Sequence, residues 1–469
     1  MTQPSLLTAV IGAGPVGLAA AAHLAARNEP FVVFEAGDSI GASVRSWSHV
    51  RLFSPWKYNV DAVARQLLEE TGWRFPRVRV TAASTEAAET GVNLDAYPTG
   101  GELVEEYLQP LADLPQIRPH IRLQTRVLSV SRQGLDKMKT SGRDDAPFVL
   151  RIQYADGEEE DVLARAVIDA SGTYHNPNPL GASGVPAAGE QRFAEHIFYG
   201  IPDVLGSERN RYVDRQALVV GSGHSAFNAI LDLATLAEDA PTTTIFWAVR
   251  RQQINQLFGG GKRDQLPARG ALGARIRELL ANGHVRLLTG IQVRKLVAGN
   301  GGIVVLHRDG ELPAVDEIIS ATGFRPDLSM LGELRVAIDP TVESAAELAP
   351  LIDPNVHSCG TVPPHGVDEL SHPERDLYIV GVKSYGRAPN FLLLSGYEQV
   401  RSIVAALTGH WESARDVQLV LPETGVCSLD RSESQDHTPE PSPVSLVTAL
   451  ARSSTIAPLR LVEAFRHCR

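Results

Sequence analysis

The chain has 469 residues, of which 43% are hydrophobic, and a formal net charge of −11 at pH 7. This length is enough to bury two or three cores, so we expect a multidomain globular protein. The negative charge argues against nucleic acid as a partner, because surfaces that neutralise phosphates need basic patches.

The first apolar run, Leu6–Ala25, is almost free of charge and could be mistaken for a membrane span. It contains Gly12, Gly14, Pro15 and Gly17, and no basic segment precedes it. These residues indicate a strand, a turn and a helix rather than a membrane helix or a signal peptide. We therefore predict no membrane association and a cytoplasmic location.

The turn itself, Gly12-Ala13-Gly14-Pro15-Val16-Gly17, has the pattern of a dinucleotide-binding fingerprint. Its first glycine tolerates the sharp turn, its second lets the backbone approach a pyrophosphate, and its third packs the helix against the strand. Glu35 ends the next apolar run, Phe31–Phe34. A carboxylate there accepts hydrogen bonds from a ribose 2′-OH and repels a 2′-phosphate, which favours FAD or NAD over NADP.

A second fingerprint, Gly221-Ser222-Gly223-His224-Ser225-Ala226, also follows a β-prone run. The next such run, Ile245–Val249, ends in Arg250 and Arg251 instead of an acid. Two guanidinium groups suit a 2′-phosphate, so this half is predicted to bind NADPH. A solvated basic loop end is the alternative interpretation. One chain with two such turns is predicted to bind two dinucleotides.

Further motifs occur in a fixed order between and after the fingerprints. They are Gly41-Ala42-Ser43-Val44-Arg45-Ser46-Trp47, Leu123-Gln124-Thr125-Arg126-Val127, Ile168-Asp169-Ala170-Ser171-Gly172-Thr173 and Ile318-Ile319-Ser320-Ala321-Thr322-Gly323. A strand that ends in small residues and glycine lets the chain pass close to a cofactor. Over about residues 6–410, this order resembles the two-dinucleotide-binding-domain flavoproteins, and most closely the flavin-containing monooxygenase-like group with its thioredoxin-reductase-like relatives.

The resemblance implies an α/β fold of two Rossmann-like three-layer nucleotide-binding domains, with the NADPH domain inserted in a discontinuous FAD domain. We place the FAD domain at residues 1–190 and 326–425, the NAD(P)H domain at 205–325, and a linker with a C-terminal helix at 426–469. Together, the fingerprints and the resemblance give candidate cofactor-binding residues and no metal ligands. These residues are Gly12, Gly14, Pro15, Gly17, Glu35, Arg45, Trp47, Val127, Gly172, Gly221, Gly223, Ser225, Arg250, Arg251, Thr322, Gly323 and Gly381.

The chain departs from the family pattern at two places. The monooxygenase fingerprint, F-x-G-x-x-x-H followed by an aromatic residue, is represented only by Phe193–Tyr199, which lacks the glycine and the spacing. Where the family has Gly-Asp beside the ribityl chain of FAD, this chain keeps Gly381 and replaces the acid, so another group must make that contact. Pro389-Asn390-Phe391 is then predicted to open a helix that runs through Leu407, with its N-terminus facing the flavin.

The cysteines bear on how electrons leave the protein. Cys359, Cys427 and Cys468 are the three cysteines of the chain, and none is part of a C-x-x-C pair. Without a local dithiol, electrons from NADPH must leave directly from the flavin.

The leading prediction is an FAD-dependent, NADPH-using oxidoreductase that acts as a monooxygenase on a small molecule and molecular oxygen, through a C4a-(hydro)peroxyflavin. The alternatives are an NAD(P)H-dependent reductase that passes electrons to a partner protein, quinone or inorganic acceptor, and a nucleotide sensor with an idle flavin. His196, Tyr199, His224 and Asn390 are the candidate catalytic residues, because donors near the flavin can stabilise developing charge. Each has a structural alternative: a loop histidine, a packing residue, a turn residue and a helix cap, respectively. A homo-oligomer is compatible with the sequence.

Overall fold

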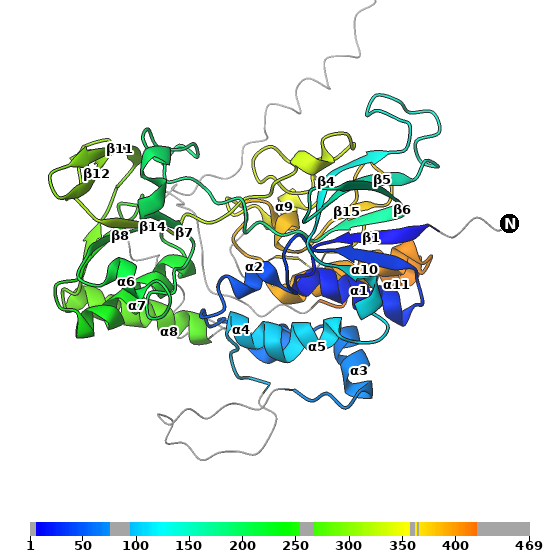
Figure 1. The fold of residues 1–469 in the computed structure, drawn as a ribbon, viewed down its shortest axis with the longest axis horizontal. Helices are drawn as coiled ribbons and strands as arrows, with labels where there is room; N and C mark the ends of the chain where they lie inside the picture. Colours follow the sequence, from blue (N-terminus) through cyan, green and yellow to red (C-terminus); the bar gives the residue numbers. More distant parts are fainter. Residues whose placement is uncertain (1–5, 76–93, 254–266, 357–361, 364, 420–469) are drawn as a thin grey trace, which may run out of the picture. The chain divides into compact units, whose positions relative to one another are not determined.

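The computed structural model describes residues 6–75, 94–253, 267–356, 362–363 and 365–419 (Figure 1). The predicted linker and C-terminal helix at 426–469, and all three cysteines, lie outside these ranges.

The first sheet has the strand order β3-β2-β1-β6-β5-β4, and β15 pairs with the second half of β6. Its strands are β1 (Leu7–Ile11), β2 (Phe31–Phe34), β3 (Ile121–Arg122), β4 (Thr125–Arg132), β5 (Phe148–Tyr154), β6 (Glu159–Asp169) and β15 (Leu377–Ile379). The strands β3, β2, β1, β6 and β15 are parallel, whereas β4, β5 and β6 form an antiparallel meander. Because β15 comes from a distant part of the sequence, this domain is discontinuous.

The two faces of the first sheet bury alternate residues of each strand, as the two-residue period of a strand requires. Val10, Val33 and Ile168 pack on the helical side, against α1 (Pro15–Ala26), α3 (Ala62–Glu70) and α10 (Leu393–Leu407). Ala9 and Val167 face the opposite side, in a core with β4 and β5 residues. The helices α1 and α10 lie side by side under the sheet (Figure 1).

Short helical elements complete this domain. They are α2 (Ala42–Arg45), η1 (Trp56–Tyr58), α4 (Gly100–Leu103), the π-helix η2 (Val104–Leu108), α5 (Gln109–Ala112), η3 (Arg118–His120), η6 (Ser329–Leu331), α9 (Ala349–Ile352), η7 (Gly381–Tyr385) and α11 (Trp411–Arg415).

The second sheet is entirely parallel, with the order β10-β9-β8-β14-β7. Its strands are β7 (Ile197–Tyr199), β8 (Gln216–Val220), β9 (Thr244–Ala248), β10 (Val285–Leu288) and β14 (Glu317–Ser320). The helices α7 (His224–Asp239) and α8 (Pro267–Ala281) cover one face, and a small sheet of β11 (Val293–Gly299), β12 (Gly302–His307) and β13 (Gly310–Glu311) covers the other. The turn η4 (Gln191–His196) and the helix α6 (Arg209–Tyr212) flank β7 and β8. The predicted fold of two Rossmann-like domains, one inserted in the other, is confirmed.

The predicted helix at Pro389-Asn390-Phe391 begins later than expected. α10 starts at Leu393, and its N-cap is Leu392, whose backbone is extended (φ −121°, ψ 150°). Because Leu392 is extended, residues 389–391 are not part of the helix. The predicted end at Leu407 is confirmed.

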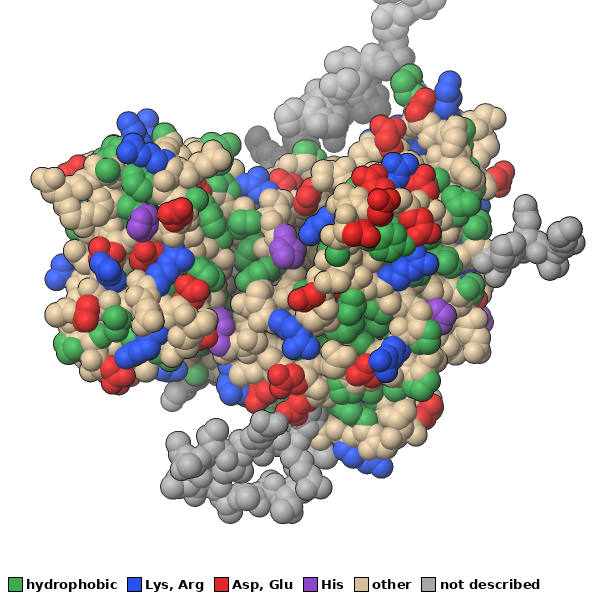
Figure 2. Space-filling model, viewed as in Figure 1, with side chains coloured by type: hydrophobic (Ala, Val, Ile, Leu, Met, Phe, Trp, Pro, Cys, Tyr) green, Lys and Arg blue, Asp and Glu red, His purple; other side chains and the backbone are tan. Residues whose placement is uncertain are grey.

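Charged side chains of both signs are interspersed on the face shown in Figure 2. Some are paired across the strands of the meander, for example Arg151 with Glu159 (3.4 Å). None of the helices in the described part of the chain has the length and apolar character needed to cross a bilayer.

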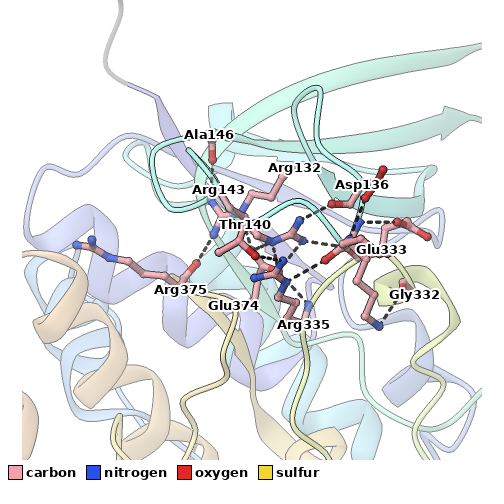
Figure 3. Close-up of polar contacts among 12 residues, drawn as sticks. Arg132, Asp136, Thr140, Arg143, Ala146, Gly332, Glu333, Arg335, Glu374 and Arg375 are labelled. Atoms are coloured by element: carbon pink, nitrogen blue, oxygen red, sulfur yellow. Dashed lines mark hydrogen bonds and ion pairs between the residues drawn. The ribbon is translucent and has the colours of Figure 1, made fainter. Parts of the chain in front are cut away.

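A buried ion cluster fastens the β4–β5 hairpin to the loop before β15 (Figure 3). Arg132 Nε lies 2.8 Å from Glu374 Oε1, and Arg143 Nη2 lies 2.8 Å from Glu374 Oε2. Arg132 also donates to the carbonyl oxygens of Ala146 and Arg375. All three charged side chains are at most 3% exposed. Because the hydrogen bonds satisfy these buried charges, the cluster holds distant segments in one geometry.

Candidate functional site

Both glycine fingerprints lie where the strand order of their sheet reverses. The first follows β1, which has β2 on one side and β6 on the other, and the second follows β8, which lies between β9 and β14. Parallel register aligns the strand ends, so that Ile11 is opposite Asp169 and Val220 is opposite Ser320. Ligands of open α/β sheets bind in the crevice at such a reversal.

The first glycine of each fingerprint lies against the small residues that follow the neighbouring strand. Gly12 has φ +101°, and a Cβ atom there would lie 2.8 Å from the carbonyl oxygen of Ala170. Gly221 has φ +139°, and its Cβ atom would lie 2.2 Å from the carbonyl oxygen of Ala321. The conformation and the space therefore both require glycine at these positions.

The second glycine of each fingerprint faces open space. A Cβ atom on Gly14 or on Gly223 would meet nothing within 4 Å. These glycines are the N-caps of α1 and α7, and neither helix has a side chain that caps its first N–H groups. Unpaired N–H groups beside open space are the features that a pyrophosphate needs, so both turns fit a dinucleotide.

The other fingerprint residues shape the helices. A Cβ atom on Gly17 would lie 1.9 Å from the carbonyl oxygen of Gly12, so this glycine permits close packing of helix and strand. Ala226, fully buried, has the same place in the second domain. Pro15 is at the start of α1, where its missing N–H costs no hydrogen bond. Ser225 is half-buried in the first turn of α7.

A cavity of about 580 Å³ lies at the first fingerprint. It brings together most of the residues predicted to bind FAD, namely Gly12, Gly14, Pro15, Glu35, Trp47, Val127, Gly172 and Gly381. Arg45 is not among the lining residues. Its Nε donates to the carbonyl oxygen of Ile40 (3.1 Å), and this hydrogen bond connects α2 to the residues that precede it.

Backbone hydrogen bonds fix the carboxylate of Glu35. Its Oε2 accepts from the N–H of Ala13 and its Oε1 from the N–H of Gly37, both at 2.8 Å. The carbonyl oxygen of Glu35 accepts from the N–H of Thr125, at the start of β4. Each carboxylate oxygen can accept more than one hydrogen bond, so Glu35 retains capacity for ribose hydroxyls. The predicted ribose acid and the strand that contains Val127 are therefore adjacent.

The cavity wall also contains side chains that the sequence analysis did not identify. The rings of Tyr174 and Phe324 are stacked, with centroids 5.2 Å apart, and both line the cavity. His175 Nε2 lies 3.3 Å from Ser43 Oγ, and both of these residues line it too. Their positions in the sequence could have identified the two aromatic residues. Tyr174 directly follows the segment that ends at Thr173, and Phe324 directly follows the one that ends at Gly323.

Thr322 and Gly323 hold the two crossover segments together. Thr322 Oγ1 donates to the carbonyl oxygen of Asn178 (2.8 Å), and the N–H of Asn178 donates to the carbonyl oxygen of Gly323 (2.9 Å). Asn178 Nδ2 also donates to the carbonyl oxygen of Thr322 (3.1 Å). Neither Thr322 nor Gly323 lines the cavity.

The residues predicted to bind NADPH follow two neighbouring strands, β8 and β9. Arg250 and Arg251 follow β9, the strand next to β8. Arg250 is exposed, and its only hydrogen bond to the described residues is a long one from Nη1 to the carbonyl oxygen of Ala182 (3.4 Å). Arg251 is half-buried. The guanidinium of Arg250 is therefore accessible to a phosphate.

His196 and Tyr199, two of the predicted catalytic residues, do not line the cavity. His196 Nδ1 lies 3.1 Å from Glu317 Oε1, and the side chain of His196 is 51% exposed. Tyr199 donates its hydroxyl to Glu190 Oε1 (2.6 Å). Burial, followed by this hydrogen bond to a carboxylate, raises the pKa of Tyr199 above its ordinary value.

His224 and Asn390 have different surroundings. His224 is the first residue of α7, and its ring centroid lies 5.2 Å from that of Phe53, a residue of the first domain. Asn390 Oδ1 is buried and has no hydrogen-bond donor among the described residues. The alternative role of Asn390 as a helix cap is wrong, because Leu392 is the N-cap of α10.

Comparison with known proteins identifies the family. Residues 9–358 match the family described as pyridine nucleotide-disulphide oxidoreductase. The chain belongs to this family. It is therefore an oxidoreductase of the pyridine-nucleotide-dependent kind.

Individual proteins of two kinds are similar to this member of the family. Flavin-containing monooxygenase FMO GS-OX-like 5 of Arabidopsis thaliana is 23% identical over 342 residues, which are 69% of this chain and 70% of that protein. The structure of bacillithiol disulfide reductase Bdr (YpdA) from Bacillus cereus matches 86% of this chain and 99% of its own, with 18% identity and a TM-score of 0.59. A mutant flavin monooxygenase from Stenotrophomonas maltophilia matches 87% and 99%, with 22% identity and a TM-score of 0.52. Both structures share the fold.

Proposed function

We propose that this flavoprotein is an NADPH-dependent monooxygenase of a small molecule. The observation that carries the proposal is the absence of any C-x-x-C pair in the sequence, which leaves the FAD cavity as the exit for electrons. The similarity to proteins named flavin-containing monooxygenases supports it. Aromatic and polar side chains on the cavity wall, Tyr174, His175 and Phe324, provide surroundings for a small substrate.

FAD, when bound, supplies hydride acceptance and reaction with oxygen. The chain supplies the rest. The N-terminus of α1 and Gly14 would hold the pyrophosphate, and Glu35 would accept hydrogen bonds from the ribose. The stacked rings of Tyr174 and Phe324 would exclude water from the cavity, and His175 with Ser43 would provide hydrogen bonds at its rim.

His224 and Asn390 remain part of the proposal as side chains that act near the reacting groups. His224 contacts Phe53 from the first domain, so it connects the N-terminus of α7 with the FAD side. Asn390 has a buried acceptor that a ligand N–H or O–H could satisfy. His196 is paired with Glu317 and Tyr199 with Glu190, so we assign these two residues a structural role outside the cavity.

A reductase without oxygenation is the second candidate. The observation that favours it is the incomplete monooxygenase fingerprint at Phe193–Tyr199, whose histidine is paired with Glu317. The similarity of the fold to a bacillithiol disulfide reductase also supports electron transfer to an acceptor other than oxygen. The acceptor would be a partner protein, a quinone or an inorganic species.

Rapid mixing distinguishes the two candidates. The enzyme is reduced with NADPH without oxygen and then mixed with oxygen, while the flavin absorbance is followed. For a monooxygenase we expect a transient spectrum that differs from those of reduced and oxidised flavin, before the oxidised spectrum returns. Tyr174→Ala should shorten the lifetime of that transient, whereas Met138→Ala, at an 89% exposed position, should not. A single slow phase with oxygen and rapid oxidation by quinones would instead establish the reductase.

A further inference from the structure

A buried lysine lines the cavity at the first fingerprint. Lys383 lies in η7, just after β15, and its side chain is 2% exposed. Its Nζ lies 2.7 Å from Asp169 Oδ2 and 3.0 Å from Ser171 Oγ. A lysine is almost never buried to this extent without a charged partner, and here Asp169 is that partner.

The hydrogen bonds of this cluster leave one N–H of the Lys383 ammonium group without an acceptor among the described residues. Asp169 Oδ1 accepts from the N–H and the hydroxyl of Ser171, and Oδ2 accepts from Lys383. An ammonium group has three hydrogens. Asp169 and Ser171 accept two of them, and within the described part of the chain Lys383 Nζ makes no other hydrogen bond.

Part of the cluster lines the cavity, and the rest is buried in the protein interior. Ser171 and Lys383 line the cavity, whereas Asp169 is fully buried behind them. Asp327 lines the same cavity, and its pKa is lowered first by hydrogen bonds from Ser329 and then by the charge of Lys383. The charge of Lys383 therefore reaches the cavity and is not confined to its partner.

The cluster also lies at the first fingerprint. The Cα of Ser171 would lie 3.1 Å from a Cβ atom on Gly12. A Cβ atom on Gly381, two residues before Lys383, would lie 3.3 Å from Val16 in the first turn of α1. The unpaired donor is thus close to the helix N-terminus that fits a pyrophosphate. A dinucleotide held at this helix N-terminus would present oxygen atoms of its pyrophosphate and of the attached ribityl chain here.

We propose that Lys383 is a direct FAD ligand, which donates its remaining hydrogen to an oxygen atom of the pyrophosphate or the ribityl chain, while Asp169 and Ser171 hold it in position. The proposal rests on FAD as the cofactor and not on the oxygenase chemistry, so its failure would leave the proposed monooxygenase function untouched. The competing explanation is a purely structural ion pair, in which Lys383 only neutralises the charge of Asp169.

A charge-matched double variant separates these explanations. Lys383→Met alone leaves Asp169 as a buried, unpaired carboxylate, so we expect a lower melting temperature of the apoprotein. Lys383→Met with Asp169→Asn removes both charges and should restore much of that loss. The dissociation constant of FAD is then measured on apoprotein by flavin fluorescence quenching. If Lys383 contacts FAD, the double variant binds FAD at least tenfold more weakly than the wild type.

An unchanged FAD dissociation constant in the double variant would overturn the proposal and leave the structural ion pair. Arg165→Met with Glu29→Gln is the matched control. It removes an ion pair of 2.7 Å in which Arg165 belongs to the same strand as Asp169, but neither residue lines the FAD cavity. We expect this control to change the melting temperature and to leave the FAD dissociation constant within twofold of the wild type.

Discussion

The carbonyl oxygen of Ala170 occupies the space that a side chain on Gly12 would need, since a Cβ atom there would lie 2.8 Å from it. Gly14, two residues later, has free space around it. The same contrast holds between Gly221 and Gly223 in the second domain. In each fingerprint, therefore, the first glycine serves the fold and the second serves the ligand.

This contrast predicts opposite effects for neighbouring substitutions. Gly12→Ala should lower the stability of the apoprotein, because a left-handed backbone alone costs an alanine about 1–2 kcal/mol and the overlap with Ala170 adds to it. Gly14→Ala should leave the melting temperature of the apoprotein unchanged but abolish retention of FAD. Gly223→Ala is the matched control, and it should retain FAD while the KM for NADPH rises. Thermal melts and the flavin content of purified protein measure these effects. Retention of FAD by Gly14→Ala would contradict the assignment.

The preference for NADPH should depend on Arg250 and Arg251. Loss of one charge-assisted phosphate contact costs about 1.5–3 kcal/mol, which is roughly ten- to a hundredfold in affinity. We expect the double variant Arg250→Ala, Arg251→Ala to raise the KM for NADPH by at least this factor and to change the KM for NADH little. Steady-state kinetics with both nucleotides measure the ratio. Equal efficiency of the wild type with NADH and NADPH would rule out the phosphate-binding role.

Acid should unfold the protein in part through Glu374. Burial by itself would raise the pKa of Glu374, but hydrogen bonds from Arg143, the backbone of Arg335 and Arg132 outweigh it and lower the pKa below its ordinary value. The unfolded chain then takes up a proton more readily than the folded one. The stabilisation is complete above the unfolded pKa of about 4.3, and it is lost as the pH falls through the lower, folded pKa.

Glu374→Gln tests this pH dependence in urea unfolding. Removal of one partner from a buried ion pair costs about 3–5 kcal/mol, so the variant should unfold at a lower urea concentration at pH 7. Its midpoint should also fall less than that of the wild type when the pH is lowered from 5 to about 3.5. Glu159→Gln removes an exposed partner of Arg151 and is the control, with a small effect at both pH values. Parallel curves for Glu374→Gln and the wild type would be evidence against the role of Glu374.

Asn390→Ala should impair activity without loss of stability. A buried acceptor with no donor costs about 1–3 kcal/mol, so its removal should leave the melting temperature unchanged or slightly higher. If a ligand satisfies Asn390 Oδ1, kcat/KM should fall. Asn59→Ala is the control, because Asn59 is fully buried and its Nδ2 donates to the carbonyl oxygens of Ser54 and Pro55. That variant should melt at a lower temperature. A similar loss of stability in Asn390→Ala would show a structural role instead.

The sequence alone determined the elements whose causes are local. A strand, a glycine turn and a helix at Gly12 and at Gly221 follow from the conformations that only glycine adopts easily. The positions of Glu35 and Arg250, each after the next strand, follow from the regular length of the unit. Two such units in one chain were sufficient to predict both domains and both cofactors.

The tertiary structure decided which distant side chains meet. Lys383 and Asp169 are separated by 214 positions and His196 and Glu317 by 121, so no local pattern connects either pair. The start of α10 was misplaced for a related reason, since Asn390 has the residue type of a cap but the backbone becomes helical only after Leu392. The side chains at the strand ends belong to segments that only folding brings together. Their hydrogen bonds, and hence their roles, are therefore set by the packing of the whole chain.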